Sequence, residues 1–332
     1  MNTTVAPARP AQSSDKGVSN SPLLSAGEVV LDALRAQVEH LRAEELGARQ
    51  TIPSAVAEMR VTTRQLRSTL RGFSRVLDPE ATLQVAQELK WLGAQLGEEN
   101  DTEAMTKEVD RLLAALPQNL IVGPVERELE HELGQLAQQG KNTIQAALAS
   151  DRYMALQHML DQLLTDPPFA RRADRPAPTE LPKNLAKAVR RLDRRLAEAD
   201  SIAPGPARDE ALHEARKADK QVRYMTEILT PTNGEPARRL GRQAKKLQDL
   251  LGDYQDAVVT RPLLQKLTEG AHANGHTPFT YQLLDALEQA RTERVLRELP
   301  HRLARLHDDR TLSWLPQSRH TQADRALVDT AI

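Results

Sequence analysis

The chain has 332 residues, of which 39% are hydrophobic and only 3% aromatic, and it contains no cysteine. The lack of cysteine excludes disulfides, thiolate catalysis and cysteine-based metal sites. The formal net charge of −1 excludes a global attraction to polyanions, so any function of that kind requires segregated charges.

The first half of the chain is predicted to be helical throughout. The Pro-, Ser- and Ala-rich residues 1–24 are expected to form a disordered tail. No apolar stretch suits a signal peptide or a membrane span, so we expect a cytoplasmic protein. Apolar spacing and helix-ending residues predict helices within 25–166, at about 27–47, 53–77, 79–96, 101–116, 122–149 and 151–164.

A Pro-rich hinge over residues 167–183 is predicted to precede a second helical half over 184–310. Its helices are expected at about 185–199, 206–229, 236–251, 256–268 and 278–306, followed by a C-terminal tail over 311–332. The abundance of Ala, Leu, Glu, Arg and Gln also favours an all-α fold. The result is a pair of bundles of roughly four helices each.

The two halves repeat one pattern of charge and glycine. The first copy consists of Arg60, Arg64 and Arg67, and the second, 156 residues later, consists of Arg216, Lys220 and Arg223. Gly97 likewise recurs as Gly252, and each is predicted to end its helix. Asp101 and Asp256 follow the glycines and are interpreted as helix N-caps or arginine partners rather than as catalytic carboxylates.

Helical facing places the cations of each copy in one stripe beside the apolar face, at about 100° per residue. The apolar faces consist of Val56, Met59, Leu66, Leu70 and Phe73 in the first half, and of Ala215, Ala218, Val222 and Leu229 in the second. No acidic residue occurs between Arg60 and Arg75, so no carboxylate on the same helix neutralises this row. Guanidinium groups bind phosphate oxygens bidentately, so such rows suit a multivalent phosphate ligand.

These residues resemble the conserved-histidine α-helical domain, CHAD, a family of proteins that bind inorganic polyphosphate. The family motif V-H-x-x-R-V-x-x-R-x-L-R is similar to residues 56–67, with Ala57 in place of the histidine. The motif L-H-x-x-R-K-x-x-K-x-x-R-Y is similar to residues 212–224, and L-Q-D-x-L-G-x-x-x-D is similar to residues 247–256. The first-half element usually reads L-G-x-x-R-D, and Asn100 replaces its arginine here.

The resemblance covers residues 25–310 and implies one CHAD domain of two pseudo-symmetric four-helix bundles with a basic central groove for polyphosphate. The ligands that it implies are Arg60, Arg64, Arg67, Lys90, His213, Arg216, Lys217, Lys220, Arg223 and Lys245. Helical facing adds Arg71, Arg242 and Lys246. The resemblance also implies a place at polyphosphate granules, near polyphosphate-metabolising proteins. Because Ala57 lacks an imidazole, we expect the second half to be the better-equipped side.

Two other functions would use the same cations. A nucleic-acid-binding protein needs them too, but single-strand binders normally interleave aromatic platforms, and few aromatic residues lie near the rows. A scaffold would satisfy its arginines internally. No metal, cofactor, membrane partner or enzymatic activity is predicted, because there is no metal–carboxylate cluster and no Walker-type loop. His213 is interpreted as a phosphate hydrogen-bond donor rather than as a metal ligand.

Overall fold

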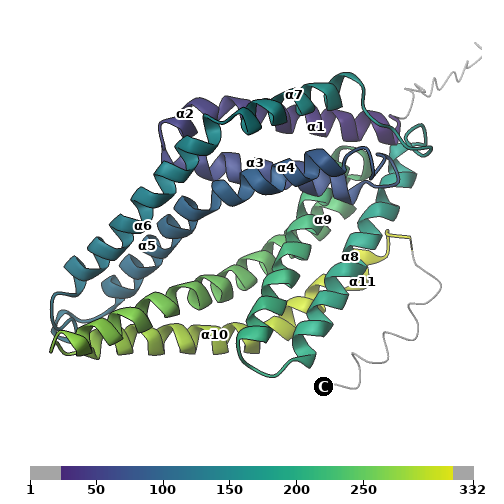
Figure 1. The fold of residues 1–332 in the computed structure, drawn as a ribbon. Coiled ribbons are helices and arrows are strands. Elements are labelled where there is room, and N and C mark those ends of the chain that lie inside the picture. Colours follow the sequence, from purple (N-terminus) through teal and green to yellow (C-terminus); the bar gives the residue numbers. More distant parts are fainter. Residues whose placement is uncertain (1–23, 317–332) are drawn as a thin grey trace, which may run out of the picture.

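The computed structural model describes residues 24–316, apart from the side chains of residues 98–101. The regular elements within this range are helices, which confirms the predicted all-α class (Figure 1). None of the described helices is both long and apolar enough to cross a membrane. Of the tails predicted over residues 1–24 and 311–332, residues 1–23 and 317–332 lie outside the described residues.

The first half contains α1 (Ala26–Ala43), α2 (Glu45–Arg49), α3 (Pro53–Gly72), α4 (Leu83–Gln95), α5 (Gly97–Ala115), a 3₁₀ turn (Gln118–Leu120), α6 (Val125–Leu148) and α7 (Asp151–Thr165). Ser25 starts α1 with a capping box, in which its hydroxyl accepts from the backbone N–H of Glu28 and the Glu28 carboxylate accepts from the backbone N–H of Ser25. Helices α1, α3, α4 and α7 lie together, whereas α5 and α6 extend away from them side by side (Figure 1).

The second half contains α8 (Ala177–Ser201), α9 (Pro206–Ala273), α10 (Phe279–Leu306) and α11 (Asp309–Leu312). Helix α9 reverses direction at Gly234, whose φ of 61° lies in the region that favours glycine. Its two segments, 206–233 and 235–273, therefore pack antiparallel, with the Tyr254 hydroxyl donating to Asp209 at 2.6 Å. This reversal confirms that the helices expected at about 206–229 and 236–251 are separate.

The core joins the two halves. All nine side chains of the predicted apolar faces are buried, with exposed fractions of 5% or less. Helix α3 approaches α9 closely at Gly72, where an added Cβ would lie only 2.8 Å from the Met225 sulfur. The α5–α6 pair also meets the pair formed by α10 and the second segment of α9, at the ends far from α3 (Figure 1). There the Tyr281 hydroxyl of α10 donates to Glu128 of α6 at 2.6 Å.

Both leucine–glycine pairs were expected to end helices, and that prediction is right for the first pair, because α4 ends at Gln95, but wrong for the second. Gly252 lies inside α9, which continues to Ala273, and only Leu96, itself in a helical conformation, separates α4 from Gly97 at the start of α5. Asp256 is consequently an interior residue of α9 and not an N-cap. Residue Asp101 also falls inside α5, and its side chain is outside the described set.

The predicted hinge is shorter than expected, because α8 already begins at Ala177. Pro182 lies inside this helix and cannot donate to the carbonyl of Pro178. Asn233 compensates, since its side-chain amide donates to that carbonyl at 3.2 Å. At the other end, Thr311 and Leu315 are buried, so the packed structure extends past the predicted boundary at residue 310.

Candidate anion-binding site

The two cation rows meet where α3 lies against the first segment of α9. Arg60 and Arg64 of α3 and Arg216 of α9 surround Lys220 closely enough to act on its titration. Burial, followed by these three guanidinium groups, lowers the pKa of Lys220 to about 6. We refer to Arg60, Arg64, Arg216 and Lys220 as the central cluster.

Part of this cationic surface has no acidic partner. Among the residues whose side chains are described, Arg64, Arg67 and Lys220 form no ion pair, and the buried Nε atoms of both arginines lack a hydrogen-bond acceptor. Burial lowers the pKa of Arg64 and of Arg67, and neighbouring arginines add to the effect. Buried donors without acceptors are costly, so these groups would gain from an anion.

Other predicted ligands are paired with acids of their own helix. The pairs are Lys217–Glu214 at 2.6 Å, Arg223–Glu227 at 3.2 Å, Arg242–Glu235 at 2.5 Å and Lys245–Asp249 at 2.8 Å. Because they are solvent-accessible pairs, each contributes little to stability and could exchange for a phosphate. Lys90, Arg71 and Lys246 are exposed. The acidic partners of Arg242 and Lys245 lie on the second segment of α9. Among the described residues, neither cation forms an ion pair with α3.

The repeated glycines have a role that the sequence analysis missed. A Cβ added at Gly252 would lie 3.3 Å from Nη2 of Arg216, and one at Gly97 would lie 4.0 Å from Nη2 of Arg60. Each glycine therefore faces the repeated arginine of its own half. Since glycine has no side chain, the guanidinium can lie close to the helix backbone.

Two acids lie beside the second cation row, and burial raises the pKa of each. Asp219 is fully buried, and neither of its carboxylate oxygens has a hydrogen-bond partner. Burial raises the pKa of Asp219 well above its usual value, against the effect of Arg223 and Lys220, and thus favours a neutral form that leaves the cations uncompensated. Burial also raises the pKa of Asp256, and Arg216 opposes this shift. The effect of Arg216 on the Asp256 pKa agrees with the interpretation of Asp256 as an arginine partner.

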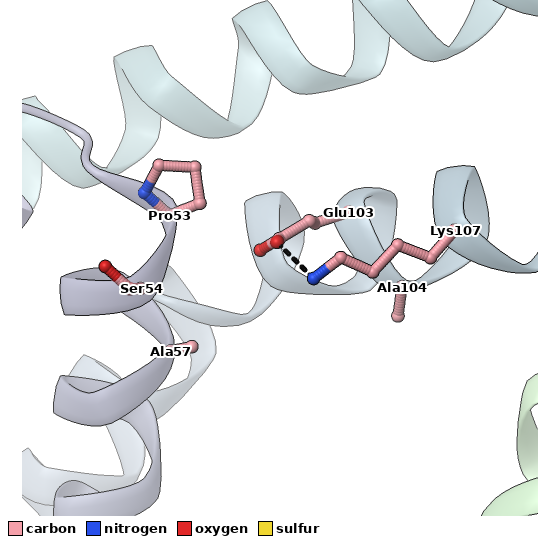
Figure 2. A pocket seen from close by; sticks show the side chains of 6 residues that line it. All are labelled: Pro53, Ser54, Ala57, Glu103, Ala104 and Lys107. Atoms are coloured by element: carbon pink, nitrogen blue, oxygen red, sulfur yellow. Dashed lines mark hydrogen bonds and ion pairs between the residues drawn. The ribbon is translucent and has the colours of Figure 1, made fainter.

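The two histidine-motif positions differ as expected. His213 Nδ1 lies 2.9 Å from the amide oxygen of Gln255, and burial followed by the charge of Lys217 lowers the pKa of His213. A neutral imidazole that donates from Nδ1 keeps only an acceptor at Nε2, so donation to phosphate from Nε2 requires protonation. Ala57 instead borders a cavity of about 270 Å³ between α3 and α5 (Figure 2). The side chain of Asn100 is outside the described residues.

One cation near the cluster was not among the predicted ligands. Arg191 of α8 is half-buried, and burial followed by the charge of Arg71 lowers its pKa, with Glu214 opposing. The dense run Arg190-Arg191 and Arg194-Arg195 is the signal that could have identified it. No group of three or more His, Asp or Glu residues in the described part of the chain is placed to hold a metal ion.

The chain resembles known proteins in its sequence. The CHAD domain model matches residues 32–265. Two Mycobacterium tuberculosis proteins, each named only as uncharacterized, are 32% identical to the chain over 274 residues, which make up 82% of this chain and 52% of each relative. The chain thus spans about half the length of these curated relatives.

The fold is also similar to that of solved structures. For PptA from Streptomyces chartreusis the TM-score is 0.67 and the identity 20%, covering 84% of this chain and 99% of that chain. For the CHAD domain from the plant Ricinus communis the TM-score is 0.63 and the identity 23%, covering 86% of this chain and 93% of that chain. At these identities the similarity concerns the fold.

Proposed function

Because the chain belongs to the CHAD domain family, we propose that it binds inorganic polyphosphate through the cations of α3 and α9 and catalyses no reaction on it. The family assignment supports the ligand class that the motifs imply. Location at polyphosphate granules and contact with polyphosphate-metabolising proteins are part of the same proposal.

One observation carries the proposal: cations from both repeats converge in the central cluster. Arg64 and Lys220 come from different halves and are separated by 156 residues, and the charge of Arg64 contributes to the lowered pKa of Lys220 after burial and Arg216. Neither forms an ion pair with a described residue, which disfavours a scaffold whose arginines are satisfied internally. A linear polyanion would supply many oxygens to such a row and release counterions on binding.

The remaining predicted ligands would act around this cluster. Arg67 and Arg71 continue the α3 row, and the exposed pair of Lys217 and the partly buried pair of Arg223 can exchange their carboxylates for a phosphate. In this proposal the basic groove is the surface between α3 and the first segment of α9. Lys90, Arg242, Lys245 and Lys246 would then contact a chain only where it extends beyond that surface.

The test is binding of sized polyphosphate by isothermal titration calorimetry, with nucleic acid as the competitor. Replacing Arg64→Glu and Lys220→Glu together should abolish binding while leaving the helical circular-dichroism signal intact. A matched control, Arg127→Glu with Lys266→Glu at the distal tip, makes the same change of charge and should bind as the parent does. Retained affinity in the first variant would refute the site. Equal competition by nucleic acid and polyphosphate would refute the ligand class.

A further inference from the structure

Helix α8 carries a row of cations that the proposed site does not use. The cations are Lys183, Lys187, Arg190, Arg191, Arg194 and Arg195. At about 100° per residue they fall within roughly 140° of arc, beside the buried face that contains Leu185 and Leu192. They therefore form one stripe along the helix.

Most of this stripe is not neutralised. Asp193 is the sole acid between Lys183 and Arg195 in the sequence, and it lies on another face of α8, where it pairs with His307 at 2.8 Å. The two end cations are paired, Lys183 with Glu180 and Arg195 with Glu198, both at 2.7 Å. The four cations between them, Lys187, Arg190, Arg191 and Arg194, form no ion pair with any described residue. We call these four the α8 row.

The α8 row begins where the α3 row ends. Arg64 and Arg71 both depress the pKa of Arg67, and Arg71 in turn depresses that of Arg191, in each case after burial. Arg64, Arg67, Arg71 and Arg191 therefore form a continuous series of cations from the central cluster to α8, in which the charge of one residue acts on the pKa of the next. The charge of Glu214 opposes the lowering of the Arg191 pKa, and Glu214 is already paired with Lys217.

Helix α1, which opens the first half as α8 opens the second, lacks such a row. The arginines of α1 are Arg35 and Arg42, and both are paired, with Asp32 at 3.1 Å and with Asp161 at 2.7 Å. A helix in this position can therefore pack without a stripe of unpaired cations. The charge of α8 is a feature of the second half alone, which points to a ligand rather than to packing.

We propose that the α8 row is a second contact surface for the same polyphosphate chain, which leaves the central cluster past Arg71 and continues along α8. This inference rests on the proposed function. The α3 row from Arg60 to Arg71 spans about 16 Å, and the α8 row from Lys187 to Arg194 adds about 10 Å, at 1.5 Å per residue. Only chains long enough to reach both surfaces gain from the second, because that contact is then intramolecular.

The test measures how the affinity for polyphosphate depends on polyphosphate length. It compares the parent protein with a variant that combines Arg191→Gln and Arg194→Gln. Short chains that occupy only the central cluster should bind the variant and the parent equally. Long chains should bind the variant at least about fivefold more weakly, and the slope of log K against log salt should fall by about 1.4 for the two lost contacts. The control, Arg127→Gln with Lys266→Gln, removes two cations from the distal tip and should match the parent at every length.

The outcomes separate this inference from the proposed function. Equal affinity of the α8 variant and the parent for long chains, or the same loss at every length, would overturn the α8 row. If the Arg64→Glu, Lys220→Glu variant has lost all binding in that same experiment, the proposed function stands even though the α8 row does not contribute. If that central variant still binds, the proposed function itself fails.

Discussion

Replacing Lys220 with methionine should stabilise the ligand-free protein and weaken polyphosphate binding. Burial and three arginines lower the pKa of Lys220 from 10.5 to about 6, so the folded protein disfavours the proton that the unfolded chain holds. At about 1.4 kcal/mol per pH unit, this cost reaches at most about 5 kcal/mol at pH 7 and about 2 kcal/mol at pH 9. Local relaxation reduces both values, and we expect Lys220→Met to recover about 2 kcal/mol at pH 7.

The assay is thermal unfolding of the parent and of Lys220→Met at pH 7 and pH 9, combined with calorimetric titration of polyphosphate. The melting temperature of the variant should rise by a few degrees at pH 7 and by less at pH 9, because the cost disappears as the pH approaches 10.5. Affinity for polyphosphate should fall at least tenfold. A lower melting temperature at pH 7 would refute the reasoning, since it would make Lys220 a stabilising partner rather than a group whose proton the folded protein disfavours.

Further predictions concern protons, the missing histidine and the glycine beside the row. Binding should take up protons, because phosphate raises the lowered pKa values of Lys220 and His213; affinity should therefore fall as the pH rises from 6 to 9, and calorimetry in buffers of different ionisation enthalpy should detect the uptake. A constant affinity over that range would contradict it. Ala57→His should raise affinity a few-fold below pH 6.5, because the bordering cavity leaves room for an imidazole (Figure 2), and an unchanged affinity would exclude this position from the site. Gly252→Ala should weaken binding several-fold with little loss of helicity, because its Cβ would displace the guanidinium of Arg216; unchanged binding would show that the close approach is not needed.

Helical spacing was sufficient to predict which faces are buried. Met59 and Leu66 in α3, and Ala215 and Val222 in α9, are all fully buried, because an amphipathic helix orients its apolar stripe toward the core. The same spacing placed Arg64 and Lys220 on adjoining stripes. Their closeness in space could be anticipated from the repeat and from the family resemblance, since no local pattern connects residues 156 positions apart.

Contacts between distant segments explain what the sequence could not show. The rule that glycine ends a helix failed at Gly252, because the approach of Arg216 and not chain reversal requires the small residue there. Pro182 stays inside α8 because Asn233, on another helix, satisfies the free carbonyl. Arg191 was missed because its neighbour Arg71 lies on a helix far away in the sequence.

The central claim is that cations of both repeats bind one polyanion, and the salt dependence of polyphosphate binding tests it most directly. One row is neutralised by Arg60→Gln, Arg64→Gln and Arg67→Gln, and the other by Arg216→Gln, Lys220→Gln and Arg223→Gln. Each triple variant should bind one chain per protein, as the parent should, with a slope of log K against log salt reduced by about 2. Two independent chains per parent molecule, or a slope that is unchanged when either row is neutralised, would contradict a shared site.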